Sequence, residues 1–94
     1  MQEMDRSVSI EMPKYVSHKE VHALKIEAVY LNGHGAEGFA TLVPENKEYA
    51  PIQVNSEYWN KHKPYGGGYY VVYPDGYKSF SPQGAFESGY TLID

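Results

Sequence analysis

The first residues in this chain that could do chemistry are two histidines, His18 and His22, which stand four positions apart. On a helix both imidazoles would share one face, which is how many zinc sites begin. A zinc site needs further nitrogen, sulfur or carboxylate ligands, and the chain has no cysteine and no H-E-x-x-H pattern. We therefore expect surface histidines, with no metal site and no cofactor.

Residues 33–38 satisfy the pattern G-x-G-x-x-G. Such a loop holds a pyrophosphate only when a helix begins within it, inside a strand–helix–strand unit. Here residues 39–44 read as a strand that Pro44 stops, so the required helix is missing. The pattern predicts a hairpin loop, and the alternative is an anion held by the backbone N–H groups of the loop.

A nucleophile and its base would have to come from Ser79, Ser81 or Ser88 together with His34 or His62. Such residue types occur in most domains, and no nucleophile elbow accompanies them. We expect that the protein is not an enzyme and has no catalytic residues.

Aromatic side chains interleaved with lysines form the strongest candidate for a binding site. Aromatic rings stack on bases or on partner side chains, and lysines hold phosphates. The candidate ligand-binding or partner-binding residues are Tyr58, Trp59, Lys61, Lys63, Tyr65, Tyr69, Tyr70, Tyr73 and Tyr77. In the alternative interpretation Trp59 anchors the core, and the lysines lie at a helix C-terminus, facing the negative end of the dipole.

The composition limits the class of protein. Ninety-four residues fit one domain with a modest core, and ten tyrosines are a heavy aromatic load. The net charge of −4 argues against binding to a nucleic-acid polymer. The absence of cysteine excludes a disulfide scaffold and fits a reducing compartment, and no apolar run is long enough for a membrane span. Because the core is small, we expect a homo-oligomer.

The chain divides into an N-terminal extension, residues 1–12, and a single globular domain, residues 13–94. The extension is polar and mixed in charge. Val8, Ile10 and Met12 alternate with polar residues, so the extension is either flexible or a short edge strand.

Two periods compete in residues 17–31. The capping-box pattern at Ser17 and Glu20 favours a helix. The alternation of Leu24 and Ile26 with charged residues, together with the turn signal at residues 32–33, favours a strand. We predict the strand.

The middle of the chain predicts two short elements. Residues 49–54 read as a strand that Pro51 confines to an edge. Residues 55–61 predict one helical turn, which Asn55 or Ser56 caps and which cannot continue through Pro64.

Residues 73–76, with the sequence Y-P-D-G, predict a hairpin. Proline presets φ at the second turn position and glycine supplies a positive φ at the fourth, which gives a type I turn with a glycine bulge. In this register the facing pairs are Tyr73 with Tyr77, Val72 with Lys78, Val71 with Ser79, and Tyr70 with Phe80.

The end of the chain predicts a helix and a last strand. Ser81 is the expected N-cap, with Pro82 at the first helical position. Gly89 is the expected left-handed stop, and residues 90–93 are expected to return as a closing strand.

Together these elements predict an α+β, mostly β fold: a small antiparallel sheet of about five strands with two short helices. The expected core is Leu24, Ile26, Ala28, Leu42, Ile52, Val54, Trp59, Val71 or Val72, Phe80, Phe86 and Leu92.

Several segments carry a family resemblance: residues 15–19 (Y-V-S-H-K), 23–26 (A-L-K-I), and above all 67–82 (G-G-Y-Y-V-V-Y-P-D-G-Y-K-S-F-S-P), followed by A-F-E and G-Y-T. With them the chain resembles a group of small uncharacterised proteins of tailed phages and prophages. This group brings no activity and no catalytic residues to carry over.

The resemblance implies a setting, the cytoplasm of an infected host. There we expect a non-enzymatic phage accessory protein that acts by binding, either as an inhibitor of a host protein or by sequestering a small anionic, nucleotide-like defence signal. The alternative is a structural or assembly protein of the virion.

Overall fold

The computed structural model describes residues 20–34 and 38–92. Predictions for the extension, residues 1–12, and for His18 lie outside the described residues. The elements are β2 (His22–Leu31), β3 (Ala40–Pro44), β4 (Ile52–Val54), α1 (Ser56–His62), β5 (Tyr69–Val72), β6 (Lys78–Ser81) and α2 (Gln83–Gly89).

The five strands form one antiparallel sheet in the order β4-β3-β2-β5-β6, which curls into a half-barrel. The predicted fold class, α+β and mostly β, is confirmed. The long strand β2 belongs to both halves of the sheet: His22–Lys25 pair with β5, and Ile26–Leu31 pair with β3. A register shift between Ile26 and Ala28 marks the bend between the halves.

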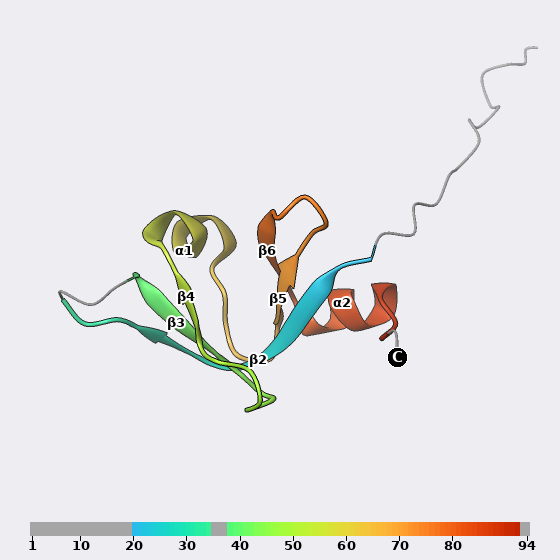
Figure 1. Cartoon of the computed structure of the whole chain (residues 1–94), viewed down its shortest axis with the longest axis horizontal. Helices are drawn as coiled ribbons and strands as arrows, with labels where there is room; N and C mark the ends of the chain where they lie inside the picture. Colours follow the sequence, from blue (N-terminus) through green and yellow to red (C-terminus); the bar gives the residue numbers. More distant parts are fainter. Residues whose placement is uncertain (1–19, 35–37, 93–94) are drawn as a thin grey trace, which may run out of the picture.

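The two helices lie on opposite sides of this bent sheet (Figure 1). Helix α1 lies in the opening of the curl, between the edge strands β4 and β6, whereas α2 lies outside the half made of β2, β5 and β6. We call the face toward α1 the inner face and the opposite one the outer face. Residues alternate between the two faces along each strand, so Tyr70 faces inward and Tyr69 outward.

The core fills the inner face. Its buried members come from the strands and from one residue of α1: Ile26, Ala40, Leu42, Val54, Tyr58 and Tyr70. The predicted core positions Ile26, Leu42, Val54 and Val71 are buried, and Ile52, Trp59 and Phe80 are partly buried against them. Two predicted core residues do not belong to this core: Leu92 is 87% exposed, and Phe86 lies on α2, outside the cluster. The most buried aromatic residue of α1 is Tyr58, which the sequence did not assign to the core.

The predicted strand and turn chemistry is confirmed in the middle of the chain. Residues from His22 onward form a strand rather than a helix. Asn55 caps α1 by accepting a hydrogen bond from the Tyr58 N–H at 2.7 Å. Lys63 ends α1 in the left-handed conformation, with φ 46°.

The β5–β6 hairpin has the predicted register in full. The Tyr73 N–H donates to the Tyr77 carbonyl at 2.9 Å and the Gly76 N–H to the Tyr73 carbonyl at 2.8 Å. Gly76 has φ +92°, a conformation that glycine adopts without strain.

The predictions for the end of the chain are wrong in detail. Ser81 still belongs to the β6 ladder, opposite Tyr69, so the N-cap position falls on Pro82, without a side-chain cap. Gly89 is the last helical residue rather than a left-handed stop, because α2 ends at an extended Tyr90 whose N–H still bonds to the Phe86 carbonyl. Residues 90–92 form no strand: α2 carries the chain over the outer face, where Tyr90 stacks on Phe86.

Candidate partner-binding groove

The structure does not bring the nine predicted binding residues together. Tyr58 and Tyr70 are core residues, 8% and 9% exposed, with ring centroids 6.0 Å apart. The Tyr58 hydroxyl donates to the Ser79 carbonyl at 2.7 Å. Burial raises the pKa of both tyrosine hydroxyls, most strongly that of Tyr58. These two rings hold α1 in the curl and offer no face to a ligand.

Trp59 and Tyr65 also pack within the fold. The Trp59 ring is partly buried, 6.0 Å from the ring of Phe39. Tyr65 is 52% exposed and sets its edge against Phe80 at 5.1 Å. The contacts of Trp59 therefore support its role in the hydrophobic packing rather than in ligand binding.

A second group of predicted residues meets where the end of α1 approaches the tip of the β5–β6 hairpin. The Lys61 ammonium lies 5.0 Å from the centre of the Tyr77 ring, and Tyr73 stacks on Tyr77 at 5.8 Å. His62, which the sequence offered only as a candidate base, lies between: its Nε2 is 3.4 Å from the Tyr77 hydroxyl. Partial burial and the charge of Lys61 lower the pKa of His62, so this ring is neutral at pH 7. Lys63 is exposed beyond it.

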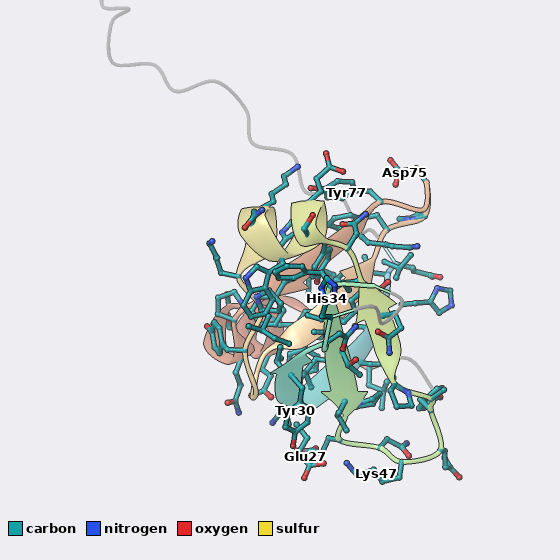
Figure 2. All side chains as sticks on the ribbon, turned by 90° about the vertical axis from the view of Figure 1, so that its left-hand side faces the viewer. Glu27, Tyr30, His34, Lys47, Asp75 and Tyr77 are labelled. Atoms are coloured by element: carbon teal, nitrogen blue, oxygen red, sulfur yellow. The ribbon has the colours of Figure 1, made fainter. Side chains whose placement is uncertain are left out.

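This tip carries only a small hollow of about 270 Å³, lined by Tyr73, Pro74, Asp75 and Tyr77. Figure 2 shows Asp75 and Tyr77 together at one end of the molecule, with the exposed Lys47–Glu27 ion pair at the other. The tip cluster is thus a set of ring contacts that orders the hairpin, with little room for a ligand.

The third group lies on the outer face, where Tyr69 begins a stack of three rings. The Tyr69 and Phe86 centroids are 4.1 Å apart with planes 19° from parallel, and Phe86 and Tyr90 are 4.6 Å apart at 18°. Phe86 and Tyr90 are one helical turn apart at the end of α2, so the helix places both rings on its sheet-facing side. The stack joins β5 to the last residues of the described chain.

Beside this stack runs a hollow of about 820 Å³, larger than the one at the hairpin tip. We call it the C-terminal groove. Residues 20–23, at and before the start of β2, form one wall, and Phe86, Glu87 and residues 90–92 form the other, with Tyr69 and Pro74 also lining it. Leu92 is 87% exposed there.

The carboxylate of Glu87 is fixed at the edge of the stack. It accepts a hydrogen bond from the Tyr69 hydroxyl at 2.7 Å and lies 3.5 Å from the Lys25 ammonium. The hydrogen bond from Tyr69, with smaller contributions from Gln83 and Lys25, lowers the pKa of Glu87. The same bond is the main reason why the pKa of Tyr69 rises to about 12. Glu87 is therefore ionised at neutral pH.

Of the nine predicted residues, only Tyr69 lines the C-terminal groove. Sequence reasoning missed Phe86, Glu87 and Tyr90 as site residues. A signal for them was present, because Phe86 and Tyr90 have the i, i+4 spacing of one helical face, with an acid beside them.

Two further findings concern the described residues only. In residues 20–34 and 38–92 no three acidic or histidine side chains come together in a way that could hold a metal ion. Over the same ranges, no helix has the length and apolar character needed to cross a membrane.

Comparisons with models of protein families, with curated proteins and with solved structures found no match to this chain.

Proposed function

We propose that this protein is a non-enzymatic phage accessory protein that binds a host protein in the cytoplasm of the infected cell. The observation that carries the proposal is the C-terminal groove. It combines about 820 Å³ of open volume with three stacked rings and an exposed leucine, in a chain of 94 residues. Apolar and aromatic surface left open in this way is typical of a binding site. The phage setting rests on the sequence resemblance alone.

The chemistry of the groove favours a protein over a nucleotide. Glu20 and Glu87 line it, and none of its lining residues is a lysine or an arginine. Among the described residues that line the groove, a phosphate group would meet two carboxylates and no lysine or arginine. The lysines expected to hold phosphates, Lys61 and Lys63, lie at the end of α1 instead, and the rings expected to stack on a base are divided between the two faces of the sheet.

The proposal is tested by affinity capture from host lysate with the full chain as bait. We expect a host protein to be retained by the unchanged chain and lost with Leu92→Asp, which puts a charge on the groove wall without touching the core. The matched control is Tyr49→Asp, at a side chain that is 53% exposed in the β3–β4 connection. No retained protein, or equal retention by Leu92→Asp, would contradict the proposal.

A role in virion assembly is the second candidate, and the outer face of the β2–β3–β4 half favours it. Tyr30 is 60% exposed there, opposite Thr41 across the β2–β3 ladder. No helix among the described residues covers this face (Figure 1). Two copies packed face to face would bury it, in keeping with the expected homo-oligomer. Mass spectrometry of purified particles decides: the chain present in stoichiometric amounts would favour this role over the first.

A further inference from the structure

Among the described residues, one edge of β2 has no neighbouring strand where β2 borders the C-terminal groove. Its first residues, His22–Lys25, pair with β5 on one side. On the other side β3 begins to pair only at Ile26. Among the described residues, no strand lies beside this edge at residues 22–24. An unpaired edge of this kind is a template for a further strand.

The direction of the main-chain groups at this edge follows from the neighbouring hydrogen bonds. Ile26 points toward β5, because its N–H donates to the Gly68 carbonyl at 2.8 Å. Lys25 points the other way, because its carbonyl accepts from the Glu45 N–H at 2.8 Å. N–H and C=O groups alternate in direction along a strand. The N–H and the C=O of Ala23 therefore both point to the open edge.

The same residues place this edge beside the ring stack. Ala23 and its neighbours in residues 20–23 line the groove together with Tyr69, Phe86 and Tyr90. The side chain of Ala23 lies on the outer face, since Leu24 is opposite the inward-facing Tyr70. A chain added along the edge would direct alternate side chains into the groove, toward the rings.

The charges along the groove are negative. Glu20 and Glu87 line it, and the charge of Glu45 also reaches Tyr69. Among the described residues, Lys25 lies beside the groove and is already engaged with Glu87 at 3.5 Å. Oxygen Oε2 of Glu87 accepts from both Tyr69 and Lys25, whereas Oε1 has only a long contact of 3.4 Å from Gln83. Oε1 is thus the oxygen placed to accept from a partner's cation.

We infer that the groove takes an extended peptide segment of a host protein, which adds to β2 at Ala23 and sets a lysine or arginine beside Glu20 and Glu87. Main-chain hydrogen bonds to the edge supply affinity, and the rings and carboxylates select the side chains, as in other cases of strand addition. The host origin of the segment rests on the proposed function; the strand addition and the preference for a cation do not.

The test uses two synthetic peptides, Ac-Ser-Val-Arg-Leu-Arg-Val-Ser-NH2 and the same peptide with glutamate in place of arginine. Binding to the full chain is followed by NMR through the amide signals of Ala23, Glu87 and Tyr90. We expect the arginine peptide to shift these signals and to bind about tenfold more tightly than the glutamate peptide, since like charges at a site are disfavoured. Equal affinity for both peptides would overturn the preference for a cation.

Strand addition is tested separately by N-methylation. Two further versions of the arginine peptide carry N-methyl groups on alternate residues, one version on the odd-numbered residues and the other on the even-numbered residues. Alternate N–H groups of a strand point to the same side, so one of the two versions has lost the N–H groups that would face β2. Because a main-chain hydrogen bond contributes about 1 kcal/mol, we expect that peptide to bind about fivefold more weakly per lost bond. If both methylated peptides bind as well as the parent, the peptide does not add to the edge.

The carboxylates are tested by Glu20→Gln and Glu87→Gln, with Glu48→Gln in the β3–β4 connection as the matched control. Each groove variant is expected to weaken the arginine peptide about threefold, the range for partly exposed ion pairs, and the control to leave it unchanged. The side chain of Glu20 makes no contact among those found in the described chain, so we expect Glu20→Gln to keep the fold. Glu20→Gln therefore remains a valid test even if Glu87→Gln loosens the ring stack. Unchanged affinity in Glu20→Gln and Glu87→Gln would overturn the assignment of the cation site.

The outcomes separate this inference from the proposed function. If a host protein is captured but the arginine peptide does not compete with it, the proposed function holds and the inference fails. If the peptide binds as described but no host protein is captured, the inference holds and the proposed function fails. Analytical sedimentation shows whether a second copy of the chain occupies the groove instead. If the peptide binds only by dissociating a dimer, the groove belongs to the dimer interface and the assignment to a host segment is overturned.

Discussion

Replacing Tyr58 with phenylalanine removes one hydroxyl from the centre of the fold and leaves the ring in place. The hydroxyl donates to the Ser79 carbonyl at 2.7 Å, and this bond ties α1 to the edge strand β6. The ring, which is 8% exposed, keeps its contacts with Tyr70 and His62 in the variant. The substitution therefore isolates the tie between the helix and the edge of the sheet.

The expected cost is about 1–2 kcal/mol of unfolding free energy. A hydrogen bond of this kind contributes about 1 kcal/mol net, and its loss costs more where, as here, it is partly buried. Removal of the whole ring, in Tyr58→Ala, should cost about 3–5 kcal/mol, because a cavity opens beneath α1. The difference between the two variants separates the tie from the packing.

The measurement is urea unfolding followed by the fluorescence of Trp59, which neighbours Tyr58 on α1. Tyr49→Phe, at a ring that is 53% exposed, is the control and should change stability by less than about 0.5 kcal/mol. If Tyr58→Phe costs no more than Tyr49→Phe, the hydroxyl does not hold α1 to β6, and the account of how the curl is closed is wrong.

Three further predictions concern Gly68, which lies against Phe80, and the Tyr69–Glu87 hydrogen bond of the outer face. Gly68→Ala would put Cβ 2.2 Å from Cζ of Phe80 and should lower the unfolding free energy by about 1–3 kcal/mol. In the control Gly84→Ala the added Cβ meets nothing within 4 Å, so the unfolding free energy should rise by up to about 1 kcal/mol. If urea unfolding shows the same change in both variants, Gly68 does not approach Phe80 closely. The hydrogen bond to Glu87 is the main reason why the pKa of Tyr69 is raised to about 12. The stability that this bond adds is fully present below about pH 10, the ordinary pKa of a tyrosine, and is lost as the pH rises from about 10 toward 12. Between about pH 10 and pH 12 the unfolding free energy should therefore fall less in Tyr69→Phe than in the unchanged chain. An equal fall in both would contradict the hydrogen bond. The same variant should raise the pKa of Glu87 in a carboxyl NMR titration, since the bond from Tyr69 is the main cause that lowers it; an unmoved pKa would assign the effect to Lys25 instead.

The parts of the fold that sequence predicted best are those decided by neighbouring residues. Pro74 and Gly76 set the hairpin turn through their own φ angles, and once the turn is fixed the pairing of β5 with β6 follows. Asn55 likewise caps α1 through a bond to a residue three positions on. Such local choices can be read from the chain because no distant contact has to be known.

The end of the chain and the site could not be predicted in the same way. Consecutive residues of a strand point to opposite faces, so Tyr69 and Tyr70 could never serve one site, and which of them faces outward depends on the distant core. Leu92 is apolar and was therefore predicted in the core, yet it follows a helix that lies on the outer face, away from the core. The ring stack needs Tyr69, Phe86 and Tyr90 together, and only the direction of α2 over the outer face brings them there.

The shared strand β2 also determines how the chain must find its fold. The β2–β3 and β5–β6 ladders join segments that follow one another along the chain, whereas the β2–β5 ladder joins residues from opposite halves of it. Closing the larger loop costs more chain entropy before any contact repays it. We therefore expect the β2–β5 pairing to be the slow step of folding. This pairing also brings residues 20–23, which form one wall of the C-terminal groove, close to Tyr69, on which the α2 wall stacks through Phe86. A nascent chain cannot form the C-terminal groove until its last strands and helix have been made.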